Sequence, residues 1–481
     1  MGTTETKTEG QRLNDELVFK TKNGWEGVNE AELRDVEAFA ARYKAFLNAG
    51  KTERELSALL LERLRAAGFA DIKEVLARGR KLEAGDKVFQ DIHGKALNFA
   101  VLGTRPVRDG LSILGAHLDS PRIDLKANPL YENAEFAFFD THYYGGIKKY
   151  QWLTIPLALH GVVFDAAGTK RAIRVGEAED DPVFVITDLL PHLAQEQQNK
   201  KLSEFITGEE LDVLAGSAPF TDDKAENKVK LNALRIMREL FGITEADFAS
   251  AEISAVPAYK ARDVGFDRSM IGAYGHDDRC CAFASIEAAL QFERAVPERT
   301  VVCTLTDKEE TGSAGNTGAD TRSFEDFTAY LCAASAAGYS GIDTRLALNN
   351  SRMLSSDVNA AFDPSYESVY DKKNCSYFGK GIAISKYTGR GGKFGASDAN
   401  AEYVRQVIGI FDQAAVRWQY GALGKVDRGG GGTIALHYAR LGVNVLDCGI
   451  PVLSMHSPFE VISKIDLWTA YRAYLAFLKA A

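Results

Sequence analysis

Residues 300–310 read Thr-Val-Val-Cys-Thr-Leu-Thr-Asp-Lys-Glu-Glu, an apolar run that ends in four ionisable residues. A short, β-branched apolar run is typical of a strand that is buried in a sheet. Open α/β sheets place their sites just beyond the carboxyl ends of such strands. The stretch therefore predicts that Asp307, Glu309 and Glu310 lie at the ligand-binding edge of an α/β sheet.

Other segments have the same pattern. Apolar runs at 111–116, 353–356 and 451–455 each lead directly into ionisable residues, which are His117 and Asp119, Asp357, and His456. A further segment, Gly275-His-Asp-Asp-Arg279, places His276, Asp277 and Asp278 at the start of a predicted helix. Together these segments supply imidazoles and carboxylates in the proportions of a zinc site.

Each motif taken alone also has a purely structural explanation. The pair Glu309–Glu310 is compatible with a solvated helix face, and Asp277–Asp278 with a helix N-terminus, which carboxylates favour. His117 and Asp119 could form a surface pair, Asp357 could lie in a turn, and His456 could be a buried core residue. Their joint occurrence after buried strands favours a metal site, because an unpaired charge at such positions would be costly.

Strands and helices alternate over most of the chain. Besides the strands above, the patterns predict helices at 29–67 (two helices), 278–295, 406–419 and 465–480, and strands at 444–446 and 451–453. The stretch from about 130 to 247 differs, with strand-like segments at 157–164 and 183–186 and a polar, lysine-rich region at 195–230. We expect an α/β domain formed by 1–130 and 248–481, interrupted by an inserted domain at 131–247.

Composition excludes several classes of protein. The chain has 57 Lys and Arg against 66 Asp and Glu, a net charge of −9, so a nucleic-acid binder that relies on a basic surface is excluded. No apolar run approaches the ~18 residues that span a bilayer, and the polar residues 1–11 do not resemble a signal peptide. Six cysteines without a Cys-x-x-Cys pair indicate reduced thiols, and we expect a cytoplasmic protein that binds neither nucleic acid nor membrane.

Three other chemistries are poorly supported. The glycine-rich stretch 428–433 is not followed by Gly-Lys-Ser/Thr, so it is not a phosphate-binding P-loop. Its glycines favour a turn or a close approach of backbone to ligand. No Gly-x-Ser-x-Gly surrounds a plausible serine nucleophile. Cys280 and Cys281 lie inside an apolar predicted helix, which argues against a cysteine nucleophile.

Five motifs, in order along the chain, resemble the aspartyl aminopeptidase and aminopeptidase I family of dinuclear zinc metallopeptidases (metallopeptidase family eighteen). They are His117-Leu-Asp-Ser-Pro, His276-Asp-Asp-Arg, Asp307-Lys-Glu-Glu-Thr-Gly-Ser, Ser356-Asp-Val-Asn-Ala and Gly449-Ile-Pro-Val-Leu-Ser-Met-His-Ser. The resemblance implies an aminopeptidase that removes the N-terminal residue of short peptides. It also implies a zinc-peptidase fold of the phosphorylase/hydrolase-like kind, a three-layer α/β/α sandwich with an inserted β-rich dimerisation and substrate-lid domain.

The resemblance further implies two divalent metal ions per subunit. His117 and Asp357 would hold one ion, Glu310 and His456 the other, and Asp277 would bridge them. Glu309 would be the general base, and Asp119 would orient His117. Zinc is the metal expected from the family, whereas ligands of this kind also admit manganese or cobalt. Dimers that associate into tetrahedral dodecamers are the family's assembly.

The residues at the family's substrate-binding positions match the family less closely. The family's Leu-Asp-Asn is His276-Asp277-Asp278 here, and Tyr150 is nearest to the position of a histidine that the aspartyl enzymes carry in a Trp-His-Thr-Trp stretch. Lys386 lies near a substrate-binding lysine of the family. Tyr150 and Lys386 are thus candidate substrate-binding residues, and the preference for acidic or neutral N-terminal residues stays open.

Two alternatives to an aminopeptidase remain. A metal-dependent amidase or deacylase could use the same scaffold and the same metal ligands. A non-catalytic, metal-stabilised assembly protein could use the fold for oligomerisation, although the presence of a complete ligand set together with a general base argues against it.

Overall fold

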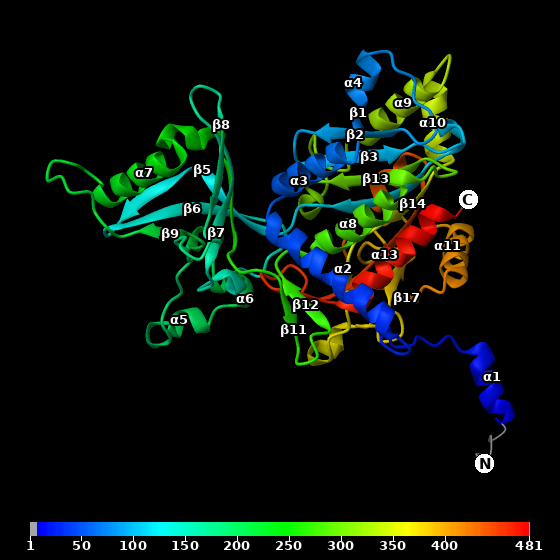
Figure 1. Cartoon of the computed structure of the whole chain (residues 1–481). Coiled ribbons are helices and arrows are strands. Elements are labelled where there is room, and N and C mark those ends of the chain that lie inside the picture. The colour runs from blue at the N-terminus through cyan, green and yellow to red at the C-terminus, as the bar shows by residue number, and fades with distance from the viewer. Residues whose placement is uncertain (1–6, 481) are drawn as a thin grey trace.

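The computed structural model describes residues 7–480 and has two lobes (Figure 1). The larger lobe is built on a nine-stranded mixed sheet in the order β1-β2-β3-β13-β4-β14-β18-β16-β17. Its strands are β1 (Ala70–Asp71), β2 (Lys87–Ile92), β3 (Ala96–Val101), β4 (Ser112–His117), β13 (Val301–Thr306), β14 (Arg352–Ser355), β16 (Ile382–Ser385), β17 (Trp418–Tyr420) and β18 (Asn444–Gly449).

Helices cover both faces of this sheet. One face packs against α2 (Glu30–Ala49), α3 (Glu53–Ala66), α8 (His276–Ala289), α11 (Ala401–Gln413) and α13 (Lys464–Lys479). The other face packs against α4 (Ile72–Ala77), α9 (Ser323–Ser335), α10 (Gly341–Asn349) and α12 (Ala435–Arg440). The result is the predicted three-layer α/β/α sandwich. The short helix α1 (Glu9–Leu17) extends away from it and has no buried residue.

Residues of β13 show why the central strands are mostly apolar. Val301, Cys303 and Leu305 face one helical layer, and Val302 faces the other. Every residue of β13 and β4 is buried. Side chains that alternate between two covered faces are apolar on both, which is the pattern of a central parallel strand.

Four central strands are parallel. β4 pairs with β13 and with β14, and β14 pairs with β18, all in parallel register. Their carboxyl ends therefore meet at one edge of the sheet, where Thr306 lies opposite His117. A separate five-stranded sheet lies beside this edge, in the order β11 (Arg262–Val264), β12 (Met270–Ala273), β20 (Glu460–Ser463), β19 (Pro451–Leu453) and β15 (Asn359–Ala360).

The smaller lobe is the inserted β-rich domain. Its six-stranded antiparallel sheet has the order β8 (Lys170–Val175), β7 (Leu157–Phe164), β10 (Glu252–Pro257), β5 (Arg122–Asn133), β6 (Phe136–Tyr144) and β9 (Val213–Gly216). Helix α7 (Lys228–Phe241) lies against this sheet, and α5 (Gln195–Gln198) and α6 (Leu202–Phe205) lie at its periphery (Figure 1). The sheet takes its strands from Arg122 to Pro257, a wider range than the expected 131–247.

Two local expectations differ from the structure. The expected helix at 406–419 ends at Gln413, because Ala415 has a positive φ of 51° and the chain then enters β17. The expected strand at 183–186 forms only isolated bridges, from Phe184 to Leu157 and from Val185 to Leu214. Within residues 7–480, no helix is long and apolar enough to cross a membrane.

Candidate metal centre

His117 ends strand β4 and is almost completely buried. Its Nδ1 atom lies 3.0 Å from the backbone carbonyl oxygen of Asp119 and 3.2 Å from Oδ1 of the same residue. A ring nitrogen that faces oxygen acceptors carries the proton. Asp119 therefore fixes the ring so that Nε2 points toward the other predicted ligands.

Asp277 is the second residue of α8, two positions after Gly275, whose φ is 79°. Its side chain is buried. Oδ1 lies 3.3 Å from Nε2 of His117, and Oδ2 lies 3.1 Å from Nε2 of His456. The two oxygens of one carboxylate thus face two different histidines.

Glu309 and Glu310 form a single 3₁₀ turn after β13 and Lys308, which has a φ of 65°. Oε2 of Glu309 lies 3.9 Å from Nε2 of His117, whereas Oε2 of Glu310 lies 3.3 Å from Nε2 of His456. Both side chains are largely buried, which excludes the solvated helix face.

Asp357 and His456 complete the cluster from two further strands. Asp357 follows β14, and its Oδ1 lies 3.9 Å from Nε2 of His117. Gly449 lies beneath Asp357, and a Cβ there would come within 1.6 Å of the Asp357 carbonyl oxygen, so only glycine fits. His456 follows β19, and its Nδ1 lies 3.0 Å from the carbonyl oxygen of Gly146 in the inserted domain. The structure therefore brings all five predicted ligands and Glu309 together.

Charges within the cluster shift its protonation equilibria. Burial opposes protonation of His117, yet hydrogen bonds to Asp119 and Asp277 outweigh it and raise the His117 pKa well above its usual value. For His456, burial is likewise outweighed by the bond to Asp277 and the charge of Glu310, which raise its pKa to about 11. Because a metal ion binds the neutral imidazole, binding of a cation at these histidines would release protons.

The carboxylates divide into two groups. Burial raises the pKa of Glu310 and Asp357 well above the usual value, and it raises the pKa of Glu309 to about 7. Burial also acts on Asp277, but its bonds to His117 and His456 are stronger and lower its pKa. Crowding and burial thus disfavour the charged forms of Glu309, Glu310 and Asp357, and a bound cation would favour them, as expected at a cation site.

The side chains fit a metal such as zinc. The ligand set consists of two imidazole nitrogens and three carboxylates without thiolate, and both histidines present Nε2 while Nδ1 is engaged with a backbone carbonyl. Oε1 of Glu310 is buried and has no hydrogen-bond partner. A buried carboxylate oxygen normally has one, and a bound cation would supply it.

Carboxylates that do not face the centre support it from outside. Asp119 accepts the backbone N–H groups of Glu309 and Glu310, each at 3.2 Å, on its two oxygens. Glu460, which is buried on β20, accepts the backbone N–H groups of His456 at 2.7 Å and of Asp277 at 3.1 Å. No sequence motif indicates this role of Glu460. Only its position four residues after His456 could have suggested it.

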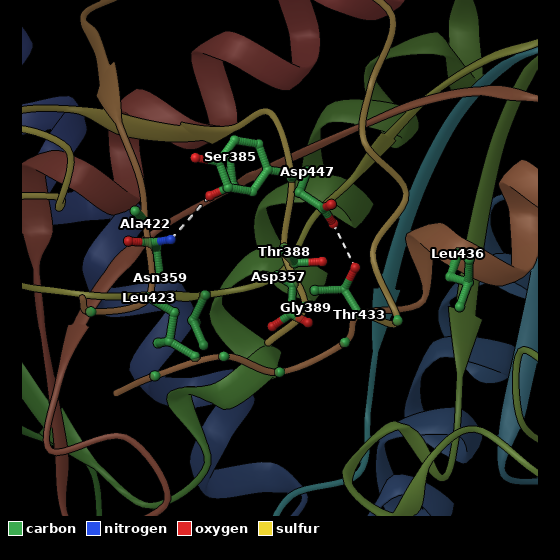
Figure 2. Close-up of a pocket in the computed structure, with 18 of the residues that line it drawn as sticks. Asp357, Asn359, Ser385, Thr388, Gly389, Ala422, Leu423, Thr433, Leu436 and Asp447 are labelled. Atoms are coloured by element: carbon green, nitrogen blue, oxygen red, sulfur yellow. Dashed lines mark hydrogen bonds between the residues drawn. The ribbon is translucent and has the colours of Figure 1, made fainter. Parts of the chain in front are cut away.

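A cavity of about 650 Å³ opens from the cluster. Beside Asp357 its wall is polar: Thr433 donates to Asp447 at 2.7 Å, and Asn359 donates to Ser385 at 3.1 Å (Figure 2). The glycine-rich stretch 429–432 lines the same cavity, as expected for a backbone that approaches a ligand. Lys386 and Tyr150 are exposed and are not among its lining residues.

Comparison with known proteins identifies the family. The family model described as "Aminopeptidase I zinc metalloprotease (M18)" matches residues 46–478. The chain belongs to this family.

Relatives within the M18 family are similar over nearly the whole chain. A probable M18 family aminopeptidase 1 from Clostridium acetobutylicum is 48% identical over 463 residues, which cover 96% of this chain and 99% of the relative. The crystal structure of an M18 family aminopeptidase from Thermotoga maritima has a TM-score of 0.91 and 41% identity, covering 96% of this chain and 100% of that one. The chain is accordingly an M18 metalloaminopeptidase, and the predicted family, fold and enzyme class are confirmed.

A solved structure of much lower sequence identity shares the fold. A structure described as the mApe1 dodecamer of yeast has a TM-score of 0.75 at 21% identity, covering 92% of this chain and 97% of that one. The fold of this chain is therefore also found at low sequence identity.

Proposed function

We propose that this M18 aminopeptidase uses two zinc ions and the carboxylate of Glu309 to hydrolyse the N-terminal residue from short peptides. The observation that carries the proposal is the position of Asp277, whose two oxygens each face the Nε2 atom of a different histidine. A carboxylate in that position suits a bridge between two cations.

The distances suggest how the ligands divide. His117 and Asp357 would hold one zinc ion, Glu310 and His456 the other, and Asp277 would contact both. Bound zinc supplies Lewis acidity, which makes water more acidic and stabilises negative charge on the scissile carbonyl group. Manganese or cobalt could take the same ligands.

Glu309 is the group best placed for proton transfer. It borders the cavity beside His117. Its Oε2 lies 3.9 Å from Nε2 of His117, farther than the 3.3 Å between Oε2 of Glu310 and Nε2 of His456. Burial holds its pKa near 7, which suits a base that accepts a proton at neutral pH and returns it. In this role Glu309 takes the proton of the attacking water and delivers it to the departing amine, while Asp119 holds the Glu309 backbone.

Short peptides suit the cavity beside Asp357, and Tyr150 and Lys386 remain candidates for contacts outside it. Because both are exposed and lie away from the lining of the cavity, they could act only on a substrate that reaches beyond it or from a neighbouring subunit.

A substrate panel tests the function. The purified chain, loaded with zinc, manganese or cobalt, is given dipeptides that differ only in their N-terminal residue, together with aminoacyl amides and N-acyl amino acids. We expect release of free N-terminal residues, and loss of that activity with a chelator. Cleavage of N-acyl amino acids alone would indicate the deacylase, and inactivity with two ions bound would indicate the non-catalytic assembly protein.

We also propose that the chain forms dimers through the inserted domain, which build a dodecamer, and that it is cytoplasmic. Exposed Leu189, Leu190 and Leu193 on the inserted domain support association, since exposed apolar groups favour burial in an interface. All six cysteines are free and buried, in keeping with a reducing compartment. Light scattering after size exclusion would test the assembly, and a monomer at micromolar concentration would contradict it.

A further inference from the structure

The inserted domain reaches into the metal centre through the end of strand β6. The hydroxyl of Tyr144, the last residue of β6, donates to Oδ2 of Asp119 at 2.9 Å. Two residues later, the carbonyl oxygen of Gly146 lies 3.0 Å from Nδ1 of His456. One short segment of the inserted domain therefore contacts the surroundings of both histidines.

Asp119 links Tyr144 to the rest of the cluster. Its Oδ1 atom faces Nδ1 of His117 and the backbone N–H of Glu309, each at 3.2 Å. Its Oδ2 atom accepts from the backbone N–H of Glu310 and from Tyr144. Without the phenol, Oδ2 would keep only the longer bond to Glu310, and the carboxylate would be held less firmly against His117.

The ring of Tyr144 is itself held firmly. The guanidinium of Arg122 lies 4.0 Å from the ring centroid, and the two residues are directly opposite each other in the β5–β6 pair. Arg122 is in turn fixed by Glu53 at 3.3 Å and Asp124 at 2.8 Å. Burial and the charge of Asp119 raise the pKa of Tyr144, so the phenol keeps its proton and remains a donor.

We propose that Tyr144 is a positioning residue of the metal centre, which fixes Asp119 by hydrogen bonding and through it the orientation of His117 and of the Glu309–Glu310 backbone. This inference rests on the proposed two-zinc function. Groups that orient a ligand through hydrogen bonds typically contribute 10- to 100-fold to metal affinity. The inserted domain would then contribute to zinc binding as well as to assembly.

Tyr144→Phe tests the proposal, because it removes the hydroxyl and keeps the ring beneath Arg122. The matched control is Tyr143→Phe on the same strand, since Tyr143 is 41% exposed and lies outside the centre. Zinc affinity is measured on the full chain by competition with a chromophoric chelator. We expect affinity about 10- to 100-fold lower in Tyr144→Phe and unchanged in Tyr143→Phe.

A double-mutant cycle with Asp119→Asn separates positioning from general damage. If Tyr144 acts through Asp119, Tyr144→Phe has little further effect on zinc affinity once Asp119 is replaced. Thermal unfolding of the zinc-free proteins checks that all variants are folded. Wild-type zinc affinity in Tyr144→Phe, or effects of the two substitutions that simply add, would overturn the proposal.

The same data distinguish this proposal from the proposed function. Wild-type protein that binds two zinc ions and hydrolyses aminoacyl substrates supports the function, whatever Tyr144→Phe does. Wild-type protein that binds no zinc would overturn both.

Discussion

Glu309 and Glu310 are consecutive residues whose carboxylates face different histidines, Glu309 toward His117 and Glu310 toward His456. A 3₁₀ turn makes this possible, since successive side chains on so tight a turn point in different directions. Both backbone amides are anchored on Asp119. The pair can therefore divide its work, with one carboxylate for the metal and the other for the proton.

Replacing Glu309 by glutamine should remove proton transfer and retain the metal. We expect kcat for aminoacyl substrates to fall by about 10²- to 10⁴-fold, because glutamine has no basic oxygen to accept the proton. Zinc content by elemental analysis should stay near two per chain. Glu402→Gln, at an exposed position of α11, is the control and should be fully active. Unchanged turnover in Glu309→Gln would remove it as the base.

Glu460→Gln should weaken the frame that holds two ligands. Both oxygens of Glu460 accept backbone N–H groups, from His456 and from Asp277, and glutamine can accept only one of them. Leaving a buried N–H unpaired costs about 1–3 kcal/mol. Thermal unfolding of the zinc-free variant should occur at a lower temperature than in wild type. An unchanged midpoint would show that Glu460 is not structurally required.

Zinc should stabilise the folded chain. Because the cluster of buried carboxylates exists only in the folded state, free zinc at 1,000 times its Kd should add about 4 kcal/mol to the free energy of unfolding. Calorimetry with zinc and with chelator measures the difference in melting temperature. Magnesium at the same concentration is the control, since it keeps its water shell and prefers oxygen ligands. Equal melting temperatures with zinc and with chelator would contradict a built metal site.

Asp466 should make stability depend on pH. Burial raises the pKa of this carboxyl group to about 7, although the backbone N–H groups of Gly379 and Gly381 each donate to it at 2.7 Å. The folded state thus binds a proton that the unfolded state has lost above its pKa of about 3.9. By linkage, the stability that this proton contributes is complete below pH 4 and is lost as pH rises to about 7.

Asp466→Asn removes this titration. The melting temperature of wild type should exceed that of the variant most at pH 5, and the difference should narrow toward pH 8. Both proteins are measured with chelator, so that zinc binding does not contribute to the pH dependence. A difference that is constant across this range would show that Asp466 does not bind the proton.

The sequence predicted the central strands and where the candidate ligands lie along the chain, because local patterns mark both. Residues 300–305 and 111–115 are mostly apolar and carry no charge, as expected of strands buried on both faces. His117 ends β4, Glu309 and Glu310 follow β13, and Asp357 follows β14, so parallel pairing brings these groups to one edge. His456 instead follows β19 of the separate five-stranded sheet, and Asp277 lies at the start of α8. The predicted helices at 29–67 and 465–480 are present for similar reasons of periodicity.

Contacts between distant segments could not be predicted in this way. Tyr144 lies in a strand of the inserted domain with no recognisable motif, and its bond to Asp119 depends on how the two lobes meet. Glu460 resembles any acidic residue in an apolar strand until its two backbone partners are seen. The helix expected at 406–419 ended early because the left-handed turn at Ala415 and the pairing of β17 with β16 outweighed local helical periodicity.

The end of β6 limits how far this enzyme could be shortened. A chain that joined the two catalytic segments directly and omitted residues 122–257 would retain Asp119, Glu309 and all five proposed ligands. It would lack Tyr144 and Gly146, and with them one donor to Asp119 and the acceptor for Nδ1 of His456. A minimal peptidase made from this fold would therefore need substitutes for two small contacts, however well its own sheet and helices folded.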